Sequence, residues 1–270
     1  MSTESRNPRS VHLSEMSTEE IVRLMNEEDA AVLSAVNRCI PAIAQIADVY
    51  AETLKNGGRV FYLGAGTSGG LALLDAAEVP PTFGMTPDHV IALTAEDGIN
   101  YTTNDEDSRS KAEEQLRMHG CGEKDFVIGV AASGSTPYVA EGLRYAKSLG
   151  AKTAAIVCNA GSVMKELADY CAEAVTGPEV LTGSTRLKAG TAEKMILNML
   201  STAAMVRLGK VYSNYMVDVK PMNEKLVRRA RNIVMEVTGC DEAQAAEAME
   251  ASNNHCMSAI RLIQGKTEHR

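Results

Sequence analysis

The stretch that decides the fold of this 270-residue chain is Val60-Phe61-Tyr62-Leu63-Gly64-Ala65-Gly66-Thr67-Ser68-Gly69-Gly70-Leu71. An apolar run ends there in clustered glycines, and a helical apolar pattern begins at once. This order predicts a buried strand, a tight turn and the N-terminus of a helix. Glycines permit positive φ and leave backbone N–H groups pointing into the turn, where an anion can bind. We therefore expect a phosphate-like group to be bound by Gly66, Thr67, Ser68 and Gly69.

Two other interpretations of this turn stay open. The turn binds nothing, or it binds a dinucleotide, since Gly64–Gly69 matches G-x-G-x-x-G. The acidic residue that a dinucleotide site needs would be Asp88, which precedes the second predicted strand instead of ending it. The position of Asp88 weighs against the dinucleotide.

The pattern of a strand followed by a helix repeats along the chain. Further strands are expected at Val90–Thr94, Asp125–Ala132 and Lys152–Cys158, and a fifth at Ala174–Thr176. This alternation predicts an α/β fold in which helices flank both faces of a parallel sheet, giving three layers.

A second turn of small and hydroxyl residues follows the third predicted strand. It contains Ser133, Gly134, Ser135 and Thr136, and a helix is expected behind it at Tyr138–Leu149. Ligands of parallel sheets bind at the carboxyl ends of the strands. Both turns are therefore expected to converge on one site.

The remaining segments are predicted to be mainly helical. Residues 1–16 are expected to form an unpacked arm, followed by a helix that a capping box at Ser17 and Glu20 begins. Further helices are expected at Ala30–Leu54, where Pro41 kinks or divides the helix, and at Gly70–Ala77, Thr103–Met118 and Met195–Leu208, with a loop at Val79–Gly84. The expected domains are residues 1–222 and a small helical module, 223–270, in which Asp241 caps a helix.

Composition excludes several classes of protein. Hydrophobic residues make up 45% and charged residues 23% of the chain, as in an ordinary globular protein. The net charge of −8, the absence of Trp and only three Phe argue against a nucleic-acid partner. Six cysteines without C-x-x-C spacing and five dispersed histidines predict idle thiols, no metal site and a cytoplasmic protein. No apolar stretch approaches the roughly 20 residues of a membrane span, and the polar N-terminus does not resemble a secretory signal.

Taken together, the motifs resemble the N-acetylmuramic acid 6-phosphate etherase family, which has a sugar isomerase (SIS) domain and is related to glucokinase regulatory protein. The matching stretches span nearly the whole chain: Thr3–Asn7, Gly64–Gly69, Asp75–Glu78, Pro80–Thr82, Ala131–Gly134, Thr136–Tyr138, Leu181–Thr191 and Asn223–Leu226. The resemblance implies a homodimer, no metal or organic cofactor, and a C-terminal module similar to ubiquitin-associated domains.

The resemblance also implies a reaction. The family removes the D-lactyl ether from C3 of an open-chain sugar phosphate: one carboxyl group takes the C2 proton, another protonates the leaving oxygen, and water then adds. The two carboxyl groups map to Glu78 and Glu106. Two carboxyl groups in opposite protonation states need different surroundings. Glu78, beside an apolar turn, is expected to be the acid and Glu106, in an acidic run, the base.

Two positions depart from the family pattern. Gly70 and Ser135 stand where the family carries Arg, one in each turn. Because an arginine fork binds a carboxylate or phosphate bidentately, their loss predicts a sugar-phosphate substrate whose 3-O-substituent differs from lactyl or is absent. Lys188 or Arg186 could compensate, since both lie in a third stretch rich in glycine and hydroxyl residues, Thr182–Thr191, and Lys188 is counted among the substrate-binding residues. An aldose–ketose isomerase and a non-catalytic sugar-phosphate sensor remain the alternative functions.

Overall fold

The computed structural model describes residues 3–96, 105–218 and 224–268. By their internal contacts the residues form two compact units, one of Met1–Ala76 with Asp88–Ala204 and one of Ala77–Pro87 with Met205–Arg270. The domain boundary expected between residues 222 and 223 lies outside the described residues.

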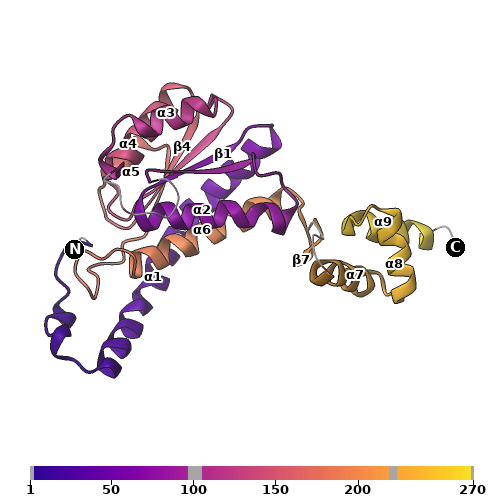
Figure 1. The fold of residues 1–270 in the computed structure, drawn as a ribbon, viewed down its shortest axis with the longest axis horizontal. Helices are drawn as coiled ribbons and strands as arrows, with labels where there is room; N and C mark the ends of the chain where they lie inside the picture. The colour runs from indigo at the N-terminus through magenta and orange to yellow at the C-terminus, as the bar shows by residue number, and fades with distance from the viewer. Residues whose placement is uncertain (1–2, 97–104, 219–223, 269–270) are drawn as a thin grey trace. The chain divides into compact units, whose positions relative to one another are not determined.

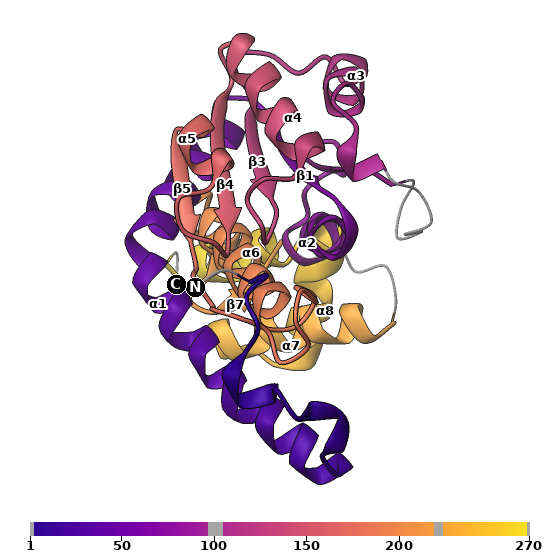
Figure 2. The ribbon, with the colours of Figure 1, turned by 90° about the vertical axis from the view of Figure 1, so that its left-hand side faces the viewer.

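The first unit contains the predicted parallel sheet. Its strands are β1 (Val60–Gly64), β2 (Val90–Thr94), β3 (Phe126–Val130), β4 (Lys152–Val157) and β5 (Tyr170–Glu173), in the order β2-β1-β3-β4-β5. All neighbouring strands are parallel, and Figure 2 shows β1, β3, β4 and β5 side by side. The fold class is confirmed. The position of the fifth strand was wrong: Tyr170, rather than Ala174, pairs with the β4 residue Ala154.

Helices cover both faces of this sheet. On one face lie α3 (Lys111–Met118), α4 (Pro137–Ser148) and α5 (Val163–Leu167), labelled to the left of β4 and β1 in Figure 1. Phe61 and Leu63 of β1 share a buried core there with Leu143 of α4. On the opposite face Tyr62 meets Tyr50 of α1 (Thr18–Lys55), with ring centroids 6.4 Å apart. Successive residues of β1 thus point to opposite layers, as the pleat of a strand requires.

The helix α1 is continuous through Pro41. The predicted capping box is present, since the Ser17 and Glu20 side chains each accept the other's backbone N–H. An 18-residue window of α1 has a mean hydropathy of 1.4, so by length and composition alone the helix could cross a membrane, and the expectation that no such stretch exists is wrong. Of this window 39% is buried inside the structure. Its buried face, including Ile46 and Tyr50, belongs to the core of the first unit.

The expected loop at Val79–Gly84 is helical instead. Helix α2 begins at Gly66 and runs to Phe83, with Pro80 and Pro81 inside it. The two prolines cannot donate the helical N–H bond. The helix nevertheless continues, because Val79 and Phe83 are buried at 2% and 7% exposure and Gly84 N–H closes the last turn on Pro80 O.

Several other boundaries differ from those expected. Helix α6 begins at Lys188, not Met195, and ends at Arg207. Residues Asp105–Asp107 form a 3₁₀ turn (η3), and α3 begins only at Lys111; residues 103 and 104 lie outside the described ranges. The N-terminal segment is not an unpacked arm. It contains the short 3₁₀ turns η1 (Pro8–Ser10) and η2 (Leu13–Glu15), and Thr3 and Asn7 are buried.

The second unit contains a two-stranded hairpin, β6 (Val211–Tyr212) and β7 (Tyr215–Met216), that the sequence did not predict. Three helices follow: α7 (Glu224–Thr238), α8 (Glu242–Ala251) and α9 (Cys256–Glu268). They bury a small core around Val234, Met249 and Ile260. The predicted cap is confirmed, because the Asp241 side chain accepts Gln244 N–H at the start of α8.

Candidate functional site

Both hydroxyl-rich turns lie at one edge of the sheet, as expected. The last residue of β1, Gly64, pairs with Thr94 of β2 on one side and with Val130 of β3 on the other, so the three strands end level. The chain passes from β1 to β2 on one side and then from β2 to β3 on the other side of β1. Such a switch point is where open parallel sheets form ligand crevices.

The first turn fits tightly against its own strand. A Cβ atom added at Gly64 would lie 2.7 Å from Gly69 Cα, and Gly66 has a φ of +54°. These two demands explain why glycine occupies the turn: the helix starts close to the strand, and the backbone enters it through the left-handed region. The backbone of α2 is thereby brought to the edge of the sheet.

The donors of the first turn are bonded to two carboxyl groups of the chain. Gly66 N–H donates to Glu96 Oε2 at 3.0 Å, and Ser68 Oγ lies 2.9 Å from both carboxyl oxygens of Glu193. Glu96 is 5% and Glu193 1% exposed. Two of the groups predicted to bind phosphate are therefore engaged by buried acids that the sequence analysis did not identify.

Burial strongly perturbs Glu193. Loss of hydration raises its pKa to about 8, and the hydrogen bond from Ser68 only partly opposes this shift. Burial, together with the charges of Glu193 and Glu179, also raises the pKa of Cys158, the residue that follows β4. With its raised pKa, the Glu193 carboxyl group carries a proton at neutral pH, unlike an ordinary surface glutamate.

The second turn is bonded differently. Ser135 N–H and Ser135 Oγ both donate to Ser133 Oγ, at 3.2 and 3.3 Å, and Thr136 Oγ1 lies 3.5 Å from the same oxygen. Thr136 is the N-cap residue of α4, but its side chain makes no capping bond. Ser135 is exposed. Within the described part of the chain these hydroxyls bond only within the turn, at the N-terminus of a helix.

The N-terminal segment reaches this edge of the sheet. Thr3 N–H donates to Asn159 Oδ1 at 2.8 Å, and Asn159 Nδ2 donates back to Thr3 Oγ1 at 2.8 Å. Asn159 follows β4 and also donates to Ala132 O, beside the second turn, at 3.4 Å. The segment is therefore held against the residues that carry that turn.

The two predicted catalytic carboxyl groups lie on different elements. Glu78 is exposed on α2, in the part of that helix that belongs to the second unit. The apolar loop that was to surround it is helical, so the basis for assigning it as the acid is absent. Glu106 is exposed in η3, which packs against α4 of the first unit. The catalytic roles of both residues stay predictions.

Lys188 serves a structural contact in this chain. Its side chain is 3% exposed, and its ammonium donates to Glu28 Oε2 of α1 at 2.6 Å. Glu28 also accepts from Asn7 and Arg9, and its pKa is lowered because the bonds from Lys188 and Asn7 outweigh the effect of burial. Arg186 is exposed. The binding role of Lys188 remains a prediction.

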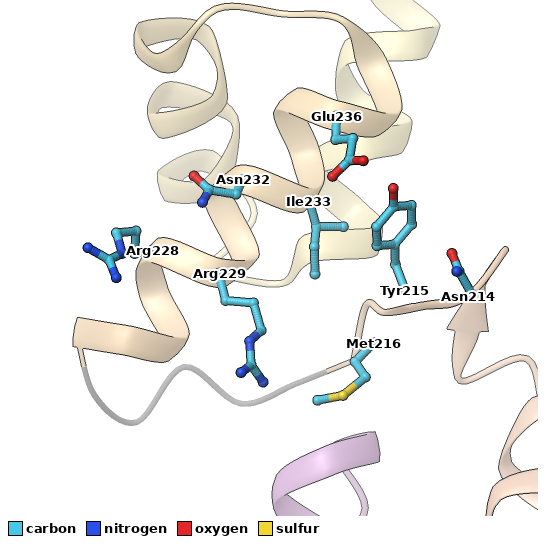
Figure 3. A pocket seen from close by; sticks show the side chains of 8 residues that line it. All are labelled: Asn214, Tyr215, Met216, Arg228, Arg229, Asn232, Ile233 and Glu236. Atoms are coloured by element: carbon cyan, nitrogen blue, oxygen red, sulfur yellow. The ribbon is translucent and has the colours of Figure 1, made fainter.

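A cavity of about 470 Å³ lies in the second unit, between the hairpin and α7. Figure 3 shows the Tyr215 hydroxyl directed toward Glu236, with Arg229 beside Met216 and Arg228 turned away. None of the predicted site residues lines it. Among the described residues, no cluster of three His, Cys, Asp or Glu side chains could hold a metal ion.

The fold and the two turns define a class of protein, the SIS domain proteins. The SIS domain family matches residues 26–158, and the C-terminal lid domain of glucokinase regulatory protein matches residues 213–260. A phosphoheptose isomerase from Francisella tularensis has the same fold, with a TM-score of 0.57, 18% identity, and coverage of 71% of this chain and 100% of that one.

Closer relatives define the family. N-acetylmuramic acid 6-phosphate etherases from Aliivibrio salmonicida and Pasteurella multocida are 49% and 50% identical to this chain over 264 residues. The matches cover 97% of this chain and 88% of each relative. The chain belongs to the N-acetylmuramic acid 6-phosphate etherase family.

The sequence offers a clue to Glu96 but none to Glu193, the two buried acids that the sequence analysis did not identify. Glu96 comes two residues after β2, at the same edge as both turns, so the rule that located the turns could also have found it. Glu193 lies in α6, just before the helix that the sequence predicted at Met195–Leu208. Its partner Ser68 is 125 residues away in the sequence, and no local pattern links the two.

Proposed function

We propose that this chain is an N-acetylmuramic acid 6-phosphate etherase that releases D-lactate from the substrate. The observation that carries the proposal is the identity of 49–50% over 97% of the chain to etherases of that name. The match of 97% of the chain extends over both units. An isomerase or a non-catalytic sensor is less well supported.

The reaction needs a base and an acid. In the open-chain sugar a carboxylate takes the proton from C2, and the electrons of that C–H bond form an enolate with the C1 aldehyde. The C3–O bond then breaks, the lactyl oxygen takes a proton, and C2=C3 forms. Water returns a hydroxyl to C3 and a proton to C2, giving N-acetylglucosamine 6-phosphate. We assign these two roles to Glu78 and Glu106, because the resemblance to the family maps its two carboxyl groups to these positions.

The phosphate site follows from the two helix N-termini. We assign it to Gly66, Thr67, Ser68 and Gly69 of the first turn and to Ser133, Gly134, Ser135 and Thr136 of the second, with Lys188 as a further candidate. The support for this assignment is the level ending of β1 and β3 and the collection of hydroxyl and N–H donors at two helix starts.

The test of the reaction is D-lactate release from N-acetylmuramic acid 6-phosphate, with mass spectrometry of the sugar product. We expect Glu78→Gln and Glu106→Gln to lower kcat by roughly 10²–10⁴-fold, the range for loss of general acid or base catalysis. Glu114→Gln, an exposed acid on α3, is the matched control and should leave kcat unchanged. A ketose phosphate formed without D-lactate would instead indicate an isomerase.

The substrate range depends on Gly70 and Ser135. Without arginine at these positions the chain is expected to bind the lactyl carboxylate weakly and to accept a related amino-sugar phosphate with another 3-O-substituent. Gly70→Arg with Ser135→Arg should then lower the KM for N-acetylmuramic acid 6-phosphate. It should not change the affinity for N-acetylglucosamine 6-phosphate, which lacks that carboxylate.

We also propose a homodimer that forms through α1 and α6. A groove of about 420 Å³ between these helices is lined by Leu33, Ile40, Met195 and Met199 among others. Leu33 is 65% and Ile40 49% exposed in the single chain, although they lie on an apolar helix. Leu33→Glu with Ile40→Glu should yield monomers in light scattering, whereas Met118→Glu, at an exposed apolar position on α3, should not.

A further inference from the structure

The contact between Ser68 and Glu193 is not an ion pair. Glu193 is a fully buried acid, and its hydrogen-bond partner is a neutral hydroxyl. Ser68 is the third residue of α2, in the first turn of the helix at the edge of the sheet. The pair thus links a buried proton to a group proposed to bind phosphate.

The protonation state of Glu193 decides what Ser68 can offer. A hydroxyl has one hydrogen to donate, whereas an ionised carboxylate only accepts. If Glu193 is ionised, the Ser68 hydrogen must point to it, and Ser68 then presents only lone pairs to a phosphate. If Glu193 is protonated, it donates its own hydrogen to Ser68 Oγ. The Ser68 hydrogen is then left for the phosphate.

Among the described residues, burial and the hydrogen bond from Ser68 set the pKa of Glu193, and no cation lowers it. Cys158 lies beside Glu193 after β4, and the charge of Glu193 raises the pKa of that thiol. Glu179 accepts two backbone bonds at the start of α6, and Glu96 accepts Gly66 N–H in the first turn. Lys188 is paired with Glu28, and Lys194 has an interaction of its own.

We propose that Glu193 is a positioning residue that holds a proton against Ser68 Oγ and so directs the Ser68 hydroxyl hydrogen to the phosphate of the bound sugar. This inference rests on the proposed function, because it assigns the first turn to the phosphate. It adds that phosphate binding requires a protonated carboxyl group, and that binding weakens when the proton is lost. The raised pKa of Glu193 places that loss near pH 8.

The test is the pH dependence of binding and turnover in the full-length chain. Isothermal titration with N-acetylglucosamine 6-phosphate gives Kd between pH 6.5 and 9.5, and D-lactate release gives KM and kcat over the same range. The phosphate is already largely dianionic above about pH 7, so its own ionisation does not mimic the effect. For the wild type, Kd and KM should rise by about tenfold per pH unit above the midpoint, as for loss of one required proton, while kcat changes less.

Glu193→Gln is the decisive variant. Its amide donates permanently to Ser68 Oγ, as the protonated acid does, so its Kd should stay constant to pH 9.5. Ser68→Ala should bind weakly at every pH and also lack the alkaline rise, which keeps the test valid if Glu193→Gln does not fold. Glu179→Gln, at another buried acid with a raised pKa, should keep the wild-type midpoint.

The outcomes separate this inference from the proposed reaction. An alkaline rise that persists in Glu193→Gln, or a wild-type Kd that does not change with pH, overturns the role of Glu193 and leaves only a structural contact between α2 and α6. Failure to release D-lactate with retained pH-dependent binding contradicts the reaction alone.

Discussion

The two turns at the edge of the sheet contain the same kinds of residues but are bonded in opposite ways. In the first, the donors Gly66 N–H and Ser68 Oγ face the buried acids Glu96 and Glu193. In the second, Ser133, Ser135 and Thr136 bond within the turn. A phosphate can therefore join the second turn directly, whereas in the first it must compete with carboxyl groups. We therefore expect phosphate binding to depend on pH at the first turn and not at the second.

The largest expected effect is a pH dependence of the free energy of unfolding that Glu193 causes. Because its pKa is raised from an ordinary value of 4.5 to about 8, folding favours the protonated form. The resulting stabilisation is complete below about pH 4.5 and is lost as pH rises through about 8. Relative to Glu193→Gln, the wild type should lose on the order of 3–5 kcal/mol of unfolding free energy between pH 5 and pH 9. Urea unfolding of both proteins at several pH values measures this difference. If the free energies of unfolding of the two proteins change with pH in parallel, the pKa of Glu193 is not raised by folding.

The second prediction compares one glycine from each turn. Gly134 has a φ of +68°, and a Cβ there would lie 2.4 Å from Ser162 Cβ, whereas a Cβ at Gly66, with a φ of +54°, meets nothing within 4 Å. Gly134→Ala combines backbone strain with a clash and should cost about 2–4 kcal/mol, whereas Gly66→Ala should cost only about 1–2 kcal/mol for the strain. Urea unfolding of the two variants gives the order of the losses. Equal losses would contradict the closer packing at Gly134 than at Gly66.

The contrast between the turns also shows what the sequence could predict. Strand–helix alternation placed both turns at one edge, because the ends of parallel strands are fixed by local pattern and topology. The helix through Pro80 and Pro81 was not predictable from local rules, since burial of Val79 and Phe83 overrides the missing backbone bonds. The bond between Ser68 and Glu193 depends on how α6 packs against α2, and Lys188 gave no sign of its partner Glu28. The function could be predicted from the resemblance of the motifs. The hydrogen bonds from the first turn to Glu96 and Glu193 could be found only in the structure.

The third prediction removes one hydroxyl from each turn. A charge-assisted hydrogen bond to phosphate contributes about 1.5–3 kcal/mol, or roughly 10–100-fold in Kd. Ser133→Ala should weaken binding of N-acetylglucosamine 6-phosphate by such a factor at both pH 7 and pH 9.5. Ser68→Ala should do so at pH 7 but have little effect at pH 9.5, where the Ser68 hydrogen already points to Glu193. Calorimetric titration at the two pH values tests this, and the same pH response in both variants would remove the distinction between the turns.

The smallest effect is expected at Glu96. Its carboxylate accepts Gly66 N–H at 3.0 Å and is 5% exposed, so a phosphate bound in the first turn lies near a buried negative charge. In Glu96→Gln the amide oxygen can accept the same hydrogen bond while the charge is gone, so repulsion falls and the Kd for N-acetylglucosamine 6-phosphate should decrease by about 2–5-fold. Glu123→Gln, at an exposed acid before β3, is the control and should leave the Kd unchanged. Weaker binding in Glu96→Gln would mean that this carboxylate contacts the sugar hydroxyls rather than opposing the phosphate, and the first turn would then be arranged for the sugar.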